Sequence, residues 1–317
     1  MKDLYVGIDV SKDTLETARS DRPNTTTCTP NTLKEIPNLV SQMVQLKPKC
    51  IVVESTGGLE RPLVDALLDA GLPVALVNPS KVRFLAKGLG IEPKTDPIDA
   101  HLLARFAELA APRLLEKYSR IQRELDGLID CRRQLIKTRV EQTNRLSTTT
   151  QKAAVKALQN VIKALDKQIA ELDRQIDEHI DSNDQWKQLY DKLTDVPGVG
   201  RVLGVTLLAK LPELGSLDSR RISRLAGVAP INNDSGIHKG KRSIKGGRAC
   251  VRNTLYMAAL AAMRSNPIIK PFAQRLQKAG KPAKVVIVAC MRKLLTLLNV
   301  MARENITWHQ LDLVKNT

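Results

Sequence analysis

The sequence predicts an α/β fold for the first third of the chain and helical structure for the rest. Short apolar runs rich in β-forming residues alternate with helical stretches up to about residue 111. From about residue 118 the chain changes to long stretches with helical apolar spacing and almost no Gly or Pro. Because 317 residues exceed one small core, we expect an α/β domain over residues 1–112, a helical coiled-coil arm over 113–190 and a mainly helical domain over 191–317.

The first domain is predicted to present acidic residues at the ends of its elements. Residues 4–10 form a strand that brings Asp9 to its C-terminal end, and residues 11–27 look like a hairpin. A helix over 31–46, with Asn31 as its N-cap, leads to a strand over 50–53 that stops at Glu54. Helices over 59–71 and 81–87 enclose a strand over 73–77, and the helix over 95–110 opens with Asp96 and Asp99.

The middle of the chain carries a seam of apolar residues in steps of four and three, which is typical of a coiled coil. The seam faces either an earlier helix of the same chain, across a turn at 147–150, or a second protomer. A plain helical spacer is the simpler alternative. The seam residues are Leu158, Ile162, Leu165, Ile169, Leu172 and Ile176.

The charge of the chain indicates a polyanionic partner. The net charge is +17, and no acidic residue lies between Asp234 and Glu304, a stretch with fifteen Lys and Arg. A solvated surface normally mixes both signs, so this stretch favours a phosphate-binding surface. The apolar run over 285–300 contains Arg292 and Lys293 and predicts a buried helix, not a membrane span. Five scattered cysteines without a CxxC pair, and the absence of a signal-peptide pattern, predict a cytoplasmic protein without zinc.

Asp9, Glu54, Asp96 and Asp99 are the acids of the first domain that could converge. Hard carboxylate oxygens are the ligands that Mg²⁺ prefers, with Mn²⁺ as an alternative, and such ions assist phosphoryl transfer. Asp96 and Asp99 are three residues apart and project from one helix face. Taken alone, these two residues would be read as a cap and a favourable charge at a helix N-terminus.

The order of these elements is that of the ribonuclease H-like nuclease fold, and the motifs resemble those of the DEDD insertion-sequence transposases, whose first domain is RuvC-like. The resemblance spans roughly residues 4–303 and keeps the motif order. It rests on Gly-Ile-Asp-Val-Ser at 7–11, Val-Glu-Ser-Thr-Gly at 53–57, Asn-Pro at 78–79, Lys-Thr-Asp-Pro-Ile-Asp-Ala at 94–100, Pro-Gly-Val-Gly at 197–200, Ala-Gly-Val-Ala-Pro at 226–230, Ser-Gly at 235–236 and Arg-Asn-Thr-Leu-Tyr at 252–256.

The resemblance implies that Asp9, Glu54, Asp96 and Asp99 bind magnesium and that Ser235 attacks DNA. It also implies a circular double-stranded intermediate and a structured guide RNA, encoded by the element, that pairs with donor and target DNA. By itself a Ser-Gly pair in such a loop predicts only a turn. Its place at the start of the acid-free stretch adds cations that would stabilise developing charge. Residues 237–240, Ile-His-Lys-Gly, depart from the family pattern, and His238 is a candidate proton carrier or phosphate contact. The candidate nucleic-acid contacts are Lys239, Lys241, Arg242, Lys245, Arg248 and Arg252.

Two other classes compete with a homo-oligomeric, RNA-guided DNA recombinase, and a plain junction resolvase is an alternative within the recombinase class. A sugar-kinase or actin type enzyme shares the Val-Gly-Ile-Asp run at 6–9, but it needs a second glycine-rich Asp loop, which the sequence lacks. A non-catalytic nucleic-acid scaffold would give the acids a structural role. A plain Holliday-junction resolvase would need the acids but neither Ser235 nor the last domain.

Overall fold

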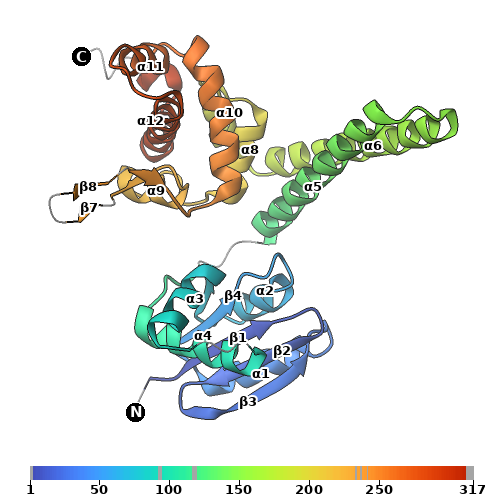
Figure 1. The fold of residues 1–317 in the computed structure, drawn as a ribbon, viewed down its shortest axis with the longest axis vertical. Helices are drawn as coiled ribbons and strands as arrows, with labels where there is room; N and C mark the ends of the chain where they lie inside the picture. Colours follow the sequence, from blue (N-terminus) through green and yellow to red (C-terminus); the bar gives the residue numbers. More distant parts are fainter. Residues whose placement is uncertain are drawn as a thin grey trace. The chain divides into compact units, whose positions relative to one another are not determined.

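The computed structural model describes residues 3–91, 95–115, 120–232, 234–235, 238–240 and 242–311. The chain forms two compact units, Met1–Tyr118 and Ser119–Thr317. The first is an α/β unit and the second is almost entirely helical (Figure 1). The predicted α/β-plus-helical fold class is confirmed, and the long helices of the expected arm belong to the second unit.

The first unit is built on a five-stranded mixed sheet with the strand order β3-β2-β1-β4-β5. β1 pairs antiparallel with β2 and parallel with β4, and β5 is parallel to β4. The acid-bearing elements therefore follow one another in the chain order expected for a ribonuclease H-like domain. The elements are β1 (Tyr5–Val10), β2 (Thr14–Arg19), β3 (Arg22–Pro30), α1 (Ile36–Leu46), β4 (Cys50–Glu54), α2 (Arg61–Asp69), β5 (Val74–Val77), α3 (Pro79–Gly88) and α4 (Asp96–Ala110).

Helices cover both faces of this sheet, which explains why its central strands are apolar on both sides. On one face, Ile8 and Val53 pack against α1 and α2. On the other face, Val52 and Ala75 pack against α3 and α4. The face assignments decide where the acidic residues of β1 and β4 point.

The prediction that Asn31 caps the first helix is wrong. α1 begins at Ile36 with Glu35 at the N-cap position. Asn31 instead donates from its side-chain amide to the carbonyl oxygen of Ser11 at 2.8 Å, which ties the end of β3 to the turn after β1. The Asn31 side chain, which the local pattern assigned to helix capping, is used instead in a tertiary hydrogen bond.

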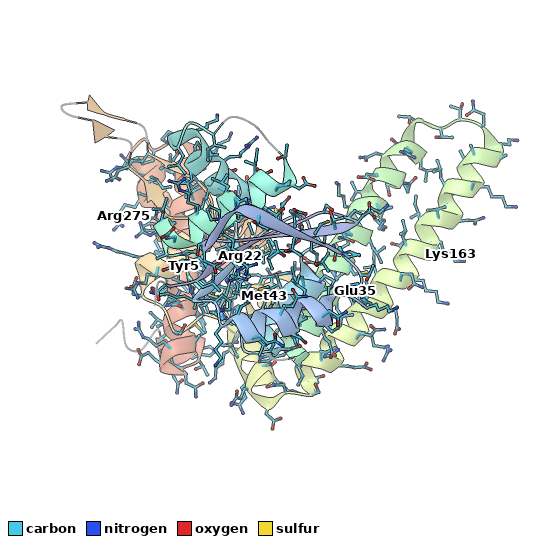
Figure 2. The ribbon with its side chains drawn as sticks, turned by 90° about the horizontal axis from the view of Figure 1, so that it is seen from below. Tyr5, Arg22, Glu35, Met43, Lys163 and Arg275 are labelled. Atoms are coloured by element: carbon cyan, nitrogen blue, oxygen red, sulfur yellow. The ribbon has the colours of Figure 1, made fainter. Side chains whose placement is uncertain are left out.

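The second unit begins with α5 (Arg120–Thr148) and α6 (Lys152–Asp181), which lie side by side (Figure 1). Arg132 pairs with Asp173 at 2.6 Å, and Arg139 pairs with Asp166 nearer the tip. Since the partner number falls as the first number rises, the two helices run antiparallel as a hairpin. Figure 2 shows side chains projecting from this hairpin, with the exposed Lys163 on α6.

The base of the hairpin is fixed to the helices that follow. The side-chain amide of Gln122 donates to the carbonyl oxygens of Leu208 and Ala209 at 2.8 and 3.1 Å. Lys210 contacts Asp126 at 2.5 Å and Asp130 at 2.8 Å, and its side chain is only 12% exposed. A charged group that is so nearly buried needs partners of opposite charge. These contacts therefore hold the base of the hairpin in place against α8 (Arg201–Lys210).

The remaining helices share one apolar core in which α12 is central. Asn299 of α12 is fully buried, and its amide bonds to Gly215 and Leu217 of the loop after α8. Among the described helices α12 alone is long and apolar enough to cross a membrane, and its inner face lies in this core as predicted. The elements are α7 (Asp184–Thr194), α8 (Arg201–Lys210), α9 (Ser219–Leu225), β6 (Pro230–Ile231), β7 (Asp234–Ser235), β8 (His238–Lys239), β9 (Ser243–Ile244), α10 (Ala249–Ser265), α11 (Ile269–Lys278) and α12 (Ala283–Glu304).

Candidate active site

Asp9 and Glu54 lie on the same face of the sheet, the face covered by α3 and α4. Side chains alternate between the two faces of a strand, and Ile8 and Val53 belong to the core on the opposite face. The parallel register pairs Ile8 with Val53, so Asp9 and Glu54 are the next residues along two adjacent strands. Both side chains are half-buried. Two carboxylates therefore reach the same end of the same face.

Helix α4 is held against β1 at Gly7, two residues before Asp9. A Cβ atom at Gly7 would lie 2.2 Å from the carbonyl oxygen of Ala100 and 2.3 Å from the amide nitrogen of Ala104. Both distances are far below any ordinary contact, so only glycine permits this approach. The contact fixes the height of α4 above the strand that carries Asp9.

The first turn of α4 carries the other two predicted acids. Asp99 is half-buried, Asp96 is exposed, and Thr95 at the N-cap position makes no side-chain capping bond. Asp99 directly precedes Ala100, the residue in contact with Gly7. Negative charge in a first helical turn is stabilised by the helix dipole by about 0.3–1 kcal/mol, so this turn tolerates two acids. All four acids are therefore carried by elements that contact one another, because β1 pairs with β4 and α4 packs against both strands.

Glu16 of β2 is a further acid on this face, and the sequence pattern did not single it out. It pairs with Asp9 in the antiparallel register, and its side chain is buried. A hydrogen bond with Glu16 raises the pKa of the Cys28 thiol, and the charge of Asp96 adds to the effect. Burial lowers the pKa of His101, against the opposing charge of Glu16. The charges of Glu16 and Asp96 therefore both act on the Cys28 thiol.

The donor set suits a hard divalent cation, but the described side chains are not gathered around one point. Carboxylate oxygens are the ligands that Mg²⁺ and Mn²⁺ prefer. Within the residues that the structure describes, no group of three or more acidic, His or Cys side chains is close enough to hold a metal ion. The backbone brings the acids to one face, and side-chain rotation would have to complete a metal site.

The loop after Glu54 is organised by the buried carboxylate of Glu60. Its Oε2 accepts hydrogen bonds from the backbone N–H groups of Thr56 and Gly58 at 3.2 and 2.8 Å, and from the Thr56 hydroxyl at 3.0 Å. Burial raises the pKa of Glu60, but the hydrogen bonds outweigh it and hold that pKa below its ordinary value. Gly57 has φ +78°, which its lack of a side chain permits. Glu60 thus shapes the loop that follows Glu54.

The predicted nucleophile lies in a short hairpin of the second unit. Ser235 pairs with His238, and Asp234 with Lys239, between β7 and β8. Lys241 lies outside the described residues, as do the placements of the Ser235, His238 and Lys239 side chains. The two units are described separately, so whether Ser235 meets the acids stays a prediction.

The other predicted nucleic-acid contacts have unequal surroundings. Arg242 and Lys245 are exposed. Arg248 forms a two-pronged pair with Glu213 at 2.5 and 2.7 Å, and the Glu213 side chain is only 4% exposed. Arg252 donates to the carbonyl oxygen of Gly246 at 2.5 Å. Arg248 and Arg252 therefore have structural partners already, and a role for them in phosphate contact stays a prediction.

Comparison with known proteins identifies the family. Residues 6–155 match the DEDD transposase domain of the IS110 type, and residues 190–274 match the transposase family IS116/IS110/IS902. A pilin gene-inverting protein of Moraxella lacunata is 30% identical over 322 residues, covering 96% of this chain and 97% of its own. The chain belongs to the IS110 family of DEDD transposases.

More distant similarities agree in part with this transposase assignment. The transposase for insertion sequence element IS1111A of Coxiella burnetii is 22% identical over 295 residues, covering 83% of this chain and 79% of that protein. The solved structure of Thermus thermophilus RuvC with a Holliday junction substrate is 15% identical and covers 35% of this chain and 99% of that one. Its TM-score of 0.26 is too low to support a conclusion about fold or function.

Family membership decides between the competing classes. The transposase is an enzyme that recombines DNA, which removes the sugar-kinase or actin alternative and the non-catalytic scaffold. The second family match, over residues 190–274, also separates it from a plain junction resolvase, which would need no such domain.

Proposed function

We propose that this transposase cuts and rejoins DNA with two sets of groups. Asp9, Glu54, Asp96 and Asp99 would hold Mg²⁺ or Mn²⁺, and Ser235 would be the nucleophile. The observation that carries the metal assignment is the contact of α4 with Gly7, because it brings a turn with two acids to the face that already carries Asp9 and Glu54.

Each acid has a distinct contribution to the proposed site. Asp9 and Glu54 are held by paired strands and would provide the fixed oxygens. Asp99 and Asp96 lie at the N-terminus of a helix and would provide the adjustable ones. When bound, a divalent ion supplies Lewis-acid stabilisation of the oxygens that attack and leave phosphorus. Glu60 keeps the backbone after Glu54 in one conformation, so that Glu54 would need only side-chain rotation to engage.

Ser235 would conserve the energy of the phosphodiester bond. Its Oγ attacks phosphorus, a P–O bond to serine forms, and the bond to the departing strand breaks. The serine proton is lost, and the oxygen of the departing strand takes up a proton. In the second half, a strand hydroxyl attacks the phosphoserine, the new phosphodiester forms and serine recovers a proton. Covalent storage of this kind is what distinguishes rejoining from hydrolysis. Nearby cations such as Arg242 and Lys245 would stabilise the developing charge.

Double-stranded donor and target DNA are the proposed substrates, and a structured RNA encoded by the element is the proposed guide. The acid-free basic stretch over residues 235–303 supports a nucleic-acid partner of either kind. The similar proteins are named for gene inversion and for transposition, which both require strands to be cut and rejoined. We further infer a homo-oligomer acting in the cytoplasm of a prokaryotic cell, where such DNA lies.

Covalent trapping tests the nucleophile. A nicked suicide substrate incubated with the wild type should leave nucleotide attached to Ser235, detected by mass spectrometry. Ser235→Ala should give neither adduct nor recombinants, whereas the control Ser265→Ala, at an exposed position near the end of α10, should give both. Recombination by Ser235→Ala would remove the serine from the mechanism and leave a purely metal-dependent one.

Asp9→Asn tests the acids independently. It should abolish cleavage and weaken Mn²⁺ binding measured by calorimetry, while DNA binding stays near the wild-type value. Asp13→Asn is the matched control, because Asp13 is an exposed acid in the turn just after β1. Normal cleavage by Asp9→Asn would refute the metal assignment.

A further inference from the structure

The second unit contains an open groove of about 900 Å³ along the outer face of α12. Its aliphatic lining, here called the floor, includes the accessible side chains of Val285 and Val288 and the buried side chains of Val228 and Leu297. Val285 is 51% exposed although valine favours burial. The buried residues of α12, Leu297 among them, belong to the core, whereas Val285 and Val288 of the same helix are exposed and half-buried within the described residues.

The rim of the groove is cationic. Arg242, Lys284, Arg292 and Lys293 line it together with the apolar residues, and no acidic residue is among the lining groups. The Nζ atom of Lys293 lies 4.6 Å from the centroid of the Phe272 ring, the one aromatic ring in the lining. None of these four cations takes part in an ion pair within the part of the chain that the structure describes. An apolar floor with an uncompensated positive rim calls for a ligand that is anionic along its edge and apolar on its faces.

We propose that this groove binds an unpaired stretch of DNA, with base faces on the aliphatic floor and phosphates at the four rim cations. The proposal rests on the assigned DNA recombination, since strands that move between duplexes must leave their partners. Duplex DNA hides its base faces in the stack and would offer the floor nothing, whereas unpaired bases expose them.

Charge argues against two protein occupants, a second copy of the chain and the chain's own last residues. A second copy of a chain with net charge +17 would bring like charges together at this rim. Residues 312–317, which follow the groove residue Leu311 in sequence, contain one acid and one base and could not neutralise four cations. A polyanionic strand meets both requirements of the groove.

Fluorescence anisotropy with the full-length protein tests the proposal. The probes are a labelled single-stranded DNA, the same strand with its central nucleotides made abasic, the matching duplex, and an RNA of the same sequence. The wild type should bind the intact single strand about tenfold or more tightly than the abasic strand, because the phosphates are equal and only the bases differ. Equal affinity for these two strands, or a tenfold preference for RNA over DNA, would overturn the assignment.

Two variants locate the binding in the groove. Val285→Glu places a carboxylate on the floor at an exposed position, and should lower single-strand affinity about tenfold while duplex affinity changes less than about twofold. Met257→Glu is the control, because Met257 is 65% exposed on α10 and does not line this groove. Lys284→Gln with Arg292→Gln, which leaves the floor intact, should reduce the salt slope for the single strand by about 0.7 for each lost contact.

The remaining outcomes separate this inference from the proposed function. Unchanged single-strand binding by Val285→Glu would overturn the assignment of DNA binding to the groove. A changed mass of that variant in light scattering would instead assign the groove to contact between copies of the chain. Asp9→Asn should keep the preference for intact over abasic DNA. If the wild type shows that preference but forms no Ser235 adduct, the groove is retained as a single-strand binding site and the proposed serine mechanism is refuted.

Discussion

Replacing Gly7 with alanine should disturb the proposed metal site by displacing the helix that carries Asp96 and Asp99. The new Cβ atom would meet two backbone atoms of α4, the Ala100 oxygen at 2.2 Å and the Ala104 nitrogen at 2.3 Å. Backbone atoms cannot rotate aside as a side chain can. The helix would have to retreat by about 1 Å for the contact to reach an ordinary 3.4 Å.

This displacement sets the expected magnitudes. Forcing an extra methyl group into a packed interior costs about 1–3 kcal/mol of folding free energy, and a backbone collision belongs at the upper end. A shift of about 1 Å in catalytic groups costs on the order of 10²-fold in rate. Gly7→Ala should therefore lower both the stability of the first unit and the rate of strand cleavage, although Gly7 carries no reactive group.

The assay compares Gly7→Ala with Gly88→Ala, in which the same methyl group is added at the end of α3 with nothing within 4 Å. Urea denaturation gives the free energy of unfolding, calorimetry gives Mn²⁺ affinity, and a gel assay gives cleavage. Gly88→Ala should match the wild type or gain up to about 1 kcal/mol. Wild-type stability together with wild-type cleavage in Gly7→Ala would refute the argument that this contact positions the site.

Three further predictions concern other parts of the molecule. Replacing Lys241, Arg242 and Lys245 together with Gln should weaken duplex binding and reduce the slope of log affinity against log salt by about 0.9 per lost phosphate contact; an unchanged slope would place the contacts elsewhere. If the arm joins protomers, Val140→Glu with Val161→Glu should lower the mass measured by light scattering, because these arm residues are 48% and 46% exposed, whereas the seam residues Leu165 and Ile169 are half-buried on the hairpin. An unchanged mass would mean that these exposed arm residues do not join protomers. Glu60→Gln should destabilise the first unit by about 1–2 kcal/mol at pH 7. Since the folded pKa of Glu60 is lowered, the stabilisation by its carboxylate is present above the unfolded pKa and is lost as pH falls through the folded pKa. The free energies of unfolding of wild type and variant should therefore converge in acid, and a difference independent of pH would mean that the carboxylate charge is not involved.

The sequence by itself determined the order of the elements, the family and the acids at element ends. These features are local, because a strand of alternating or continuous apolar residues, a proline-started helix and a short motif each depend on neighbours in the chain. The motifs around Asp9, Glu54 and Asp99 were visible for this reason. The same holds for the basic stretch after Asp234, which is a property of composition.

Only the tertiary structure decided which groups those elements bring together. Asn31 has a good capping side chain, yet its amide is used 20 residues away at Ser11. Glu16 joins the acidic face because β2 pairs with β1, and Arg248 is partly withdrawn from the basic surface because Glu213 lies against it. The groove on α12 depends on what α11, β6 and β9 leave uncovered. Such pairings arise from packing between segments distant in sequence, and a local pattern carries no information about which distant partner will satisfy a buried charge or cover an apolar face.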